Sequence, residues 1–354
     1  MNWIKNGVTL VLAVLFALIV AEFITRVLLP LDLSGSWRVV DDHGLLLNKS
    51  SGTSVHQRGD RKAIYKFESN GVRSTSIPTS PHDKRVLILG DSFTFGWLLS
   101  TADTYVYNLA KKHNDKRFYN AAAGGWGTAD YTAYLETYCR AINPGITLVF
   151  MNADDIGRMH RSTLYKSSDE LDALIRQPFQ PTMSQLVKKT INSFPGYQFL
   201  LTKSHLIQLI RKIGLGNFTR KKDVENVNQQ QQLAFGMNEG LSPSHSIQLA
   251  SLFFKHLSDV ASSCGTQLKI VYIGVQEKNS APAGFYPTLN FIEYAGESNF
   301  FTRLQVSFLD LSETRQMKKY RESLDTFTIV GDGHPNELGA QLIFEALDES
   351  NILE

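Results

Sequence analysis

The chain has 354 residues, of which 43% are hydrophobic and 20% charged, with a net charge of +2. This is the composition of an ordinary globular protein, long enough for one large domain or two small ones. The nearly neutral charge balance gives no reason to expect a nucleic-acid partner. Its two cysteines, Cys139 and Cys264, lack the spacing of metal or redox motifs. We expect two buried thiols, with a disulfide as the alternative, and neither a metal nor a cofactor.

The N-terminal segment is the most apolar part of the chain. Residues 7–21 are apolar or small except for one threonine, and counting on to Leu29 gives enough length to cross a bilayer, with Arg26 extending to the interface. Lys5 favours a cytoplasmic N-terminus. We therefore predict a signal anchor over residues 1–30, so that a single-pass membrane protein carries the rest of its chain outside the cytoplasm. A cleaved signal peptide and a buried core helix are the alternatives.

The remaining chain divides into an irregular segment and an alternating one. Residues 31–80 show little periodicity and are expected to be a lead-in with short strands. Residues 81–354 alternate between strands and helices, which predicts an α/β fold with a five-stranded parallel sheet and helices on both faces. The predicted strands are at 85–89, 118–123, 147–151, 268–275 and 306–311, and the predicted helices at 102–114, 128–142, 246–264 and 336–348.

One region interrupts this alternation. Residues 160–240 have apolar side chains at helical spacing and predict an inserted helical lobe. Between Arg176 and Lys222 there are nine lysines or arginines and no acidic residue. The basic side chains form either a solvated face or a surface toward anionic lipid or glycan. The run NQQQQ at 228–232 indicates a linker or the polar start of a helix.

The stretch VLILGDSFTFG, residues 86–96, places a serine just after a buried strand. Ligands of open parallel sheets bind beyond the carboxyl ends of the strands. Ser92 is therefore a candidate nucleophile, for which it would need a base and donors for an oxyanion. The alternative is that Ser92 only caps the following helix.

Histidine is the usual base for such a serine, and His334 differs from the other eight histidines in its setting. It lies in GDGHPNELGA, just before the last predicted helix, which Asn336 can cap. Asp332, two residues earlier, can orient the imidazole. The alternative is a plain turn and helix cap. We expect the other histidines to be surface or capping residues.

GDS and DGHPN together resemble the sequence blocks of the SGNH/GDSL hydrolase family. The resemblance implies a flavodoxin-like three-layer sandwich, with Ser92 as nucleophile and Asp332 and His334 completing a triad. Many family members have the aspartate three residues before the histidine, where this chain has Gly331, so it resembles the variant with Asp-x-His.

Two further blocks resemble the same family. NAAAGGWGT, which begins at Asn120, matches a block in which the backbone amide of Gly125 helps to bind the oxyanion, together with that of Ser92. SNGVRS at 69–74 is similar to the lead-in of membrane-anchored members. Trp97 and Trp126 follow two of these blocks and either stack on a sugar ring or pack in the core.

The third block departs from the family. In LVFMNADDIGR the family's oxyanion-binding asparagine falls on Asp154 and its aspartate on Asp155. An ionised aspartate cannot donate a hydrogen bond. Either Asn152 takes the role through a shifted loop, or Asp154 is protonated, or the donor is missing. We expect Asn152 to be the donor.

These observations predict a membrane-anchored serine hydrolase that removes or transfers O-acetyl groups on an extracytoplasmic glycan, so that its expected partners are an acylated carbohydrate or other ester and the membrane. A lipid or thioester hydrolase is one alternative. The other is a non-catalytic binding or assembly protein of polysaccharide biosynthesis that keeps the fold.

Overall fold

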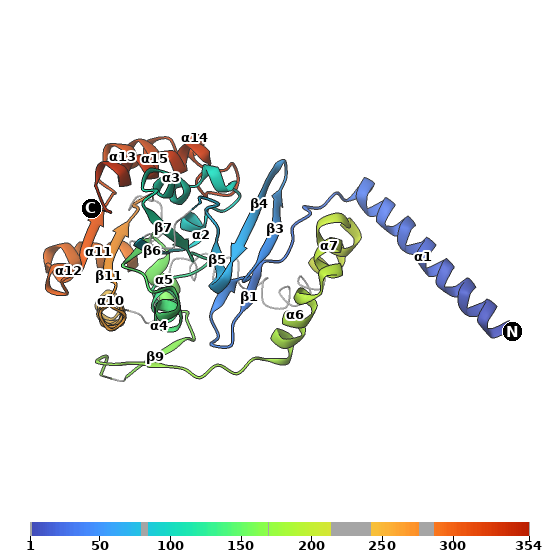
Figure 1. Ribbon diagram of the computed structural model, residues 1–354, viewed down its shortest axis with the longest axis horizontal. Helices are drawn as coiled ribbons and strands as arrows, with labels where there is room; N and C mark the ends of the chain where they lie inside the picture. Colours follow the sequence, from blue (N-terminus) through green and yellow to red (C-terminus); the bar gives the residue numbers. More distant parts are fainter. Residues whose placement is uncertain (1, 79–83, 169, 214–241, 276–286, 354) are drawn as a thin grey trace.

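The computed structural model describes residues 2–78, 84–168, 170–213, 242–275 and 287–353 (Figure 1). Five parallel strands form the centre of its main sheet, in the order β12-β11-β8-β6-β7. When these five strands are numbered along the chain and read from β7 to β12, the order is 2-1-3-4-5, the flavodoxin-like arrangement. The five are β6 (Lys84–Leu89), β7 (Lys116–Asn120), β8 (Ile146–Met151), β11 (Gln267–Tyr272) and β12 (Ser307–Asp310). The predicted α/β fold with a parallel sheet is confirmed.

Three antiparallel strands from the lead-in extend this sheet to eight strands. They are β3 (Gly52–Arg58), β4 (Arg61–Glu68) and β5 (Val72–Arg73), with the short helix η1 (Ser69–Gly71) before β5. β1 (Arg38–Val40) and β2 (Leu46–Asn48) form a separate hairpin. The lead-in thus packs edge to edge with the parallel strands, and the sheet is mixed rather than purely parallel.

Helices cover both faces of the sheet and bury its two apolar surfaces. One face carries α4 (Thr128–Ile142), α10 (Pro243–Cys264), α11 (Pro287–Glu297) and α12 (Phe300–Arg303). The other carries α3 (Tyr105–Lys112), α13 (Arg315–Glu322), α14 (Leu324–Phe327) and α15 (Glu337–Glu349), and the short helix η2 (Thr101–Asp103) precedes α3. The strands β6, β8 and β11 between them are almost fully buried, as expected for a parallel sheet covered on both sides.

The two cysteines form a disulfide, so the expectation of two free thiols is wrong. Cys139 and Cys264 lie near the C-terminal ends of α4 and α10, which pack against each other. Because these helices lead into the neighbouring parallel strands β8 and β11, their C-terminal ends meet, and the two Cα atoms are 6.3 Å apart. This separation lies within the range of ordinary disulfides.

The inserted region lies beside the lead-in and begins with the small hairpin of β9 (Tyr165–Ser167) and β10 (Leu174–Arg176). It continues through α6 (Met183–Ser193), α7 (Pro195–Lys203) and a helix over 205–213. The predicted linker at 228–232 lies outside the described residues.

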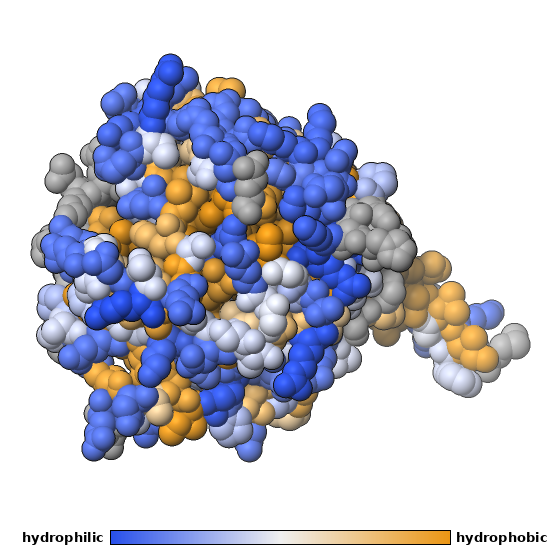
Figure 2. All heavy atoms as spheres, turned by 60° about the vertical axis from the view of Figure 1, so that its left-hand side comes forward, coloured by the Kyte–Doolittle hydropathy of each residue, from blue (hydrophilic) through white to orange (hydrophobic). Residues whose placement is uncertain are grey.

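The N-terminal helix α1 (Asn2–Leu28) projects away from the body. Its stretch Trp3–Leu28 is long and apolar enough to cross a membrane, and none of its most apolar window is buried. Figure 2 shows apolar side chains of this helix projecting beyond the body of the molecule. A helix of this kind at an N-terminus serves either as a membrane anchor or as a signal sequence.

Candidate active site

Ser92 lies at the carboxyl end of β6, at the point where the strand order of the sheet reverses. Gly90 ends the strand, and a Cβ at that position would lie 2.2 Å from Oγ1 of Thr94, so only glycine fits. Asp91 then caps the short helix α2 (Ser92–Phe95) by accepting a hydrogen bond from Phe93 N at 2.8 Å. As the first residue of α2, Ser92 has a backbone N–H without a partner in the helix.

His334 reaches Ser92 from a loop 242 residues further along the chain. Its Nε2 lies 2.8 Å from Oγ of Ser92, and its Nδ1 is hydrogen-bonded to Oδ1 of Asp332. Asn336 holds the loop as predicted, because its Oδ1 accepts from Gly339 N at 3.0 Å and caps α15. Serine, histidine and aspartate therefore form a continuous hydrogen-bonded chain.

A residue that sequence reasoning missed holds the carboxylate in this chain. Arg58, the last residue of β3, is ion-paired with Oδ2 of Asp332, whose side chain is only 2% exposed. The same guanidinium donates to the carbonyl of Gly331 at 2.6 Å. The lead-in hairpin thus fixes the loop that carries the aspartate, and one carboxylate oxygen remains for His334.

Aromatic rings enclose the imidazole of His334. Trp97 stacks on it with centroids 5.5 Å apart, and Phe93 lies 5.3 Å away. His56 packs edge-on against Trp97 at 4.3 Å, is buried, and shares a 2.7 Å hydrogen bond with Tyr65. The expectation of a surface or capping role is wrong for His56, because its strand β3 joins the main sheet instead of remaining at the periphery.

This enclosure lowers the pKa of His334 to about 4. Burial is the largest cause, the cations of Arg158 and Arg58 act in the same direction, and the carboxylates of Asp91 and Asp154 oppose it. The imidazole is therefore neutral at neutral pH. Only a neutral imidazole can accept a proton from the serine hydroxyl.

The turn at Gly124 and Gly125 lies next to Ser92. A Cβ on Gly124 would be 3.8 Å from Cβ of Ser92, and Gly125 has a φ of +85°, which favours glycine. Arg38, on β1, donates from Nη2 to the carbonyl of Gly124 at 2.7 Å. That carbonyl belongs to the same peptide as the Gly125 N–H, so the bond both orients this N–H and strengthens it as a donor.

Trp126 and Asn120, from the same sequence block, have structural positions. Trp126 is 1% exposed, and its Nε1 donates to the carbonyl of Leu46 at 2.6 Å. The alternative that it packs in the core is therefore correct, and its ring is not available to a sugar. Asn120 donates to the carbonyl of Thr94 at 3.2 Å and accepts from Ala122 N. It joins the second block to helix α2.

The loop after β8 places the two candidate oxyanion residues differently. The side-chain Oδ1 of Asn152 accepts from Ala153 N at 2.9 Å, which fixes the orientation of its amide. No described residue accepts a hydrogen bond from its Nδ2. Asp154 instead pairs with Nη2 of Arg158 at 3.2 Å. Burial raises the pKa of Asp154, and Arg158 lowers it.

Arg158, on α5 (Asp155–Met159), joins the first and third blocks, and sequence reasoning missed it too. Its Nη1 lies 2.9 Å from Oδ2 of Asp91 and 3.3 Å from Oδ1 of Asp155, and it also donates to the carbonyl of Trp126. Burial alone would lower the pKa of Arg158. The carboxylates around it have the opposite and larger effect, so the pKa is raised above its usual value. The spacing of Asp154 and Arg158 on one helix was a sequence signal for part of this cluster.

Asp155 is buried and accepts hydrogen bonds at Oδ2 from Tyr131 OH at 2.7 Å and from Asn152 N at 2.9 Å. Burial raises its pKa well above the usual value, and the neighbouring Asp91 raises it further. This carboxylate therefore holds the backbone of the Asn152 loop.

Arg73, within SNGVRS, explains why the lead-in block accompanies the nucleophile block. Its buried guanidinium donates to the carbonyls of Phe95, Gly96 and Leu99 at 2.5, 2.7 and 2.8 Å. These carbonyls lie at the C-terminal end of the helix that begins at Ser92 and in the loop after it. Arg73 thus fastens the loop that carries Trp97.

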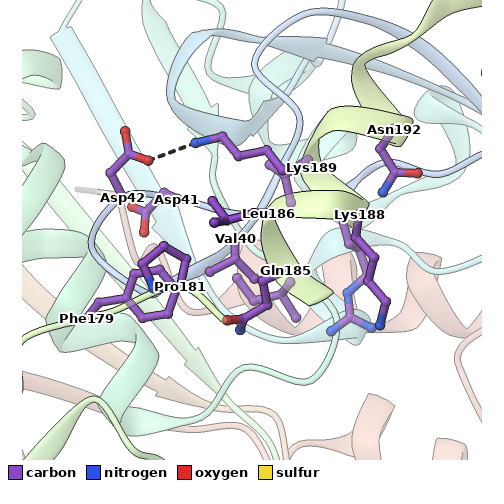
Figure 3. Close-up of a pocket in the computed structure, with 13 residues that line it drawn as sticks. Val40, Asp41, Asp42, Phe179, Pro181, Gln185, Leu186, Lys188, Lys189 and Asn192 are labelled. Atoms are coloured by element: carbon purple, nitrogen blue, oxygen red, sulfur yellow. Dashed lines mark hydrogen bonds and ion pairs between the residues drawn. The ribbon is translucent and has the colours of Figure 1, made fainter. Parts of the chain in front are cut away.

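A cavity of about 440 Å³ lies between β1 and α6, and Figure 3 shows its lining. Phe179, Pro181 and Val40 supply apolar surface, and Gln185 and Asn192 supply amide groups. Lys189 crosses its edge to an ion pair with Asp42. The triad does not line this cavity, but Arg38 does, and the same side chain contacts the Gly124 turn.

Comparison with known proteins gives a distant likeness. No family model matches, and no curated protein matches. One similar solved structure is that of TesA, which has 13% sequence identity over 76% of this chain and 99% of that chain, with a TM-score of 0.39. Another is the psychrotrophic esterase EstA from Pseudoalteromonas sp., with 12% identity over 76% of this chain and 96% of that chain and a TM-score of 0.41. A mutant of Axe2, an acetyl-xylooligosaccharide esterase from Geobacillus, is also similar (13%, 78% and 97%, 0.39). The descriptions of EstA and Axe2 name esterases, the enzyme class that the sequence predicted, but at these scores the function must come from the geometry of the site.

Proposed function

We propose that the chain is a membrane-anchored serine hydrolase of the SGNH type that acts on esters, with Ser92 as nucleophile, His334 as base and Asp332 as the orienting carboxylate. The observation that carries this proposal is the hydrogen-bonded chain from Ser92 through His334 to the buried Asp332. If Ser92 served only to cap a helix, it would need neither a neutral imidazole at its Oγ nor a carboxylate behind that imidazole.

In the proposed reaction, His334 takes the proton of Ser92 as Oγ attacks the ester carbonyl, and Asp332 stabilises the imidazolium. The backbone N–H groups of Ser92 and Gly125 bind the oxyanion, with Nδ2 of Asn152 as the third donor. The imidazolium then gives its proton to the leaving alcohol. Water, or a sugar hydroxyl, finally attacks the acyl-enzyme, and His334 takes up the proton of that attacking group and returns it to Ser92.

The substrate that we propose is an O-acetyl ester on an extracytoplasmic glycan, as the resemblance of the blocks implies. The cavity beside Arg38 supports this, because its apolar surface and amide groups suit a sugar ring, and its volume of about 440 Å³ suits a small ligand. Trp97 stacks on His334 at the site itself. A substrate sugar would approach this region with its acetyl group toward Ser92.

We propose that α1 remains attached as a signal anchor and that the body lies outside the cytoplasm. Glu22 and Arg26, near the end of α1, make hydrogen bonds with residues 203–206, and a segment removed during export would have no need of such contacts. The Cys139–Cys264 disulfide agrees with an oxidising compartment.

The experiment that tests the proposed function measures turnover of p-nitrophenyl acetate and of an acetylated glycan by the purified full chain. Ser92→Ala and His334→Ala should each lower kcat by at least about three orders of magnitude. Ser100→Ala is the matched control, since this serine is exposed and lies outside the triad. Unchanged turnover in Ser92→Ala would contradict the proposal and favour a non-catalytic binding protein.

A further inference from the structure

Several large apolar side chains are exposed to solvent on and around α7, which is unusual for a soluble protein. We refer to α7 and the helix over 205–213, with the residue before them, as the 194–213 helix pair. Phe194, Phe199 and Ile210 are 65%, 62% and 55% exposed. Leu200 and Ile213 are exposed as well. Large exposed apolar side chains gathered on one short segment are typical of a site of contact with a partner or a membrane.

The opposite side of the helix pair is firmly seated on the lead-in. Leu201 is fully buried, and Gln208 donates to the carbonyls of Ser34 and Leu201 at 2.8 and 2.5 Å. Gln198 accepts from Ser36 N at 3.1 Å. Because one side of the pair is fixed by these contacts, the apolar side chains on the other side are directed away from the body.

The helix pair is also joined to the end of α1. Glu22 accepts hydrogen bonds from Ser204 Oγ at 2.7 Å and from the backbone N–H groups of His205 and Leu206 at 3.1 and 2.9 Å. It thereby caps the second helix of the pair. Arg26 donates to the carbonyl of Lys203 at 2.9 Å. Figure 1 shows α7 close to the end of α1 that meets the body.

These contacts set the depth of the helix pair relative to a bilayer that α1 crosses. At about 1.5 Å per residue, the stretch from Trp3 to Ala21 is roughly 28 Å long. The hydrocarbon core of a bilayer is about 30 Å thick. Glu22 and Arg26 therefore lie where the hydrocarbon ends and the headgroups begin, and so do the residues at 203–206 that they bind.

The charge of this region matches a headgroup layer with anionic lipids. Lys203 and Lys212 are exposed on the helix pair, and the sequence from Arg176 to Lys222 contains nine basic and no acidic residues. Basic and apolar side chains side by side are typical of helices that lie in a membrane interface.

We infer that the 194–213 helix pair rests on the surface of the membrane that α1 crosses, with its apolar side chains among the headgroups and its lysines on anionic lipids. This inference rests on the proposed membrane anchor. It gives the body two points of attachment, α1 and the helix pair. The Ser92–His334 site is thereby held in a fixed orientation to the bilayer, whereas attachment through α1 alone would let the body reorient.

The test uses the full chain in lipid nanodiscs with single cysteines carrying an environment-sensitive fluorophore. Both native cysteines are in the disulfide, so an introduced cysteine is the free thiol that reacts. Phe199→Cys reports on the helix pair, Phe16→Cys on the anchor, and Leu338→Cys, 57% exposed on α15, is the matched control. All three variants should keep wild-type ester turnover, which shows that the fold is intact.

Lipids that carry a nitroxide near the headgroup should quench the label at residue 199 strongly in bilayers with phosphatidylglycerol and more weakly in phosphatidylcholine alone. The label at residue 16 should be quenched by nitroxides deep in the acyl chains, and the label at 338 by neither. A label at 199 that behaves like the one at 338, while residue 16 is quenched, would overturn the inference and leave the anchor intact. An unquenched residue 16 would overturn the anchor and the inference with it, and quenching at 199 that ignores lipid charge would overturn the role of the lysines.

Discussion

Two arginines lie near the Ser92–His334 pair, and they differ in origin, in exposure and in the carboxylates with which they pair. Arg58 comes from the lead-in, is 51% exposed, and pairs with the one carboxylate behind the imidazole. Arg158 comes from the loop after β8, is 18% exposed, and lies among the carboxylates of Asp91, Asp154 and Asp155. Both cations lower the pKa of His334.

Because the two arginines differ in burial, we expect one to matter mainly for stability and the other mainly for catalysis. A mostly buried cation beside the buried carboxylates of Asp91 and Asp155 is needed for the fold, because removing it leaves buried charge without compensation. An exposed cation contributes little to stability, but Arg58 holds Asp332 in place behind His334. We therefore expect changes at Arg158 to appear first in unfolding experiments and changes at Arg58 to appear in kinetics.

The largest effect is expected for Arg158→Met, which should lower the free energy of unfolding by about 3–5 kcal/mol. Denaturant unfolding of the purified chain measures it, with Arg58→Met as the matched control, expected to stay within about 1 kcal/mol. The loss should become smaller as the pH falls, because burial raises the pKa of Asp155 and a protonated carboxyl needs no counter-charge. Equal losses in the two variants would contradict the division between them.

Asn152→Ala tests what the Arg158 side of the site does for catalysis, since Asp155 and Arg158 support its loop. Loss of one oxyanion donor should lower kcat by about two to three orders of magnitude. Labelling of Ser92 by a fluorophosphonate should remain detectable. Turnover at the wild-type level would show that Asn152 is not a donor.

Arg58→Met should lower kcat by about 10- to 100-fold, the size of effect seen when the hydrogen-bond partner behind a metal ligand is removed. The pH profile distinguishes this positioning role from a structural one. In the wild type, turnover should rise as the pH increases through about 4, where His334 loses its proton, and should then level off. Removing the nearby cation stabilises the imidazolium, so the rise should move to higher pH. Arg58→Lys should restore part of both properties.

The smallest effect is expected for Asp154→Asn. The carboxylate of Asp154 is partly exposed and pairs with Arg158 one turn along the helix. Such pairs are worth only about 0.3–0.5 kcal/mol, so turnover should remain within about twofold of the wild type. A clear increase in activity would place Asp154, and not Asn152, next to the oxyanion.

The sequence was sufficient to predict the parallel core and the meeting of Ser92 with His334. The alternation of strands and helices along the chain predicts parallel strands, whose carboxyl ends, and the loops that follow them, lie at one edge of the sheet. It did not predict that β3 to β5 join that sheet. Buried positions alternate along β3 and β4, but those of β3 are the polar residues Ser54 and His56, and the exposed Ile64 obscures the alternation of β4 in the sequence. Pairing with the edge strand β7 decides their position, and that is a tertiary contact.

The same limit explains the residues of the site that were missed. Arg58 meets Asp332 from a position 274 residues away, and nothing near it in the sequence indicates a partner. Arg38 acts on the Gly124 carbonyl from an equally irregular segment. Arg158, by contrast, carried a local signal through its spacing from Asp154. The disulfide was misjudged because the packing of α4 on α10, and not either local pattern, brings Cys139 to Cys264.

The central claim is that Ser92 is a nucleophile activated by His334. It is tested most directly by treating the full chain at pH 7 with a fluorophosphonate and mapping the modified peptide by mass spectrometry. We expect one modification, on Ser92, which is absent in Ser92→Ala and at least about a hundredfold slower in His334→Ala. Absence of labelling in the wild type, or labelling of another residue at the same rate in Ser92→Ala, would contradict the claim.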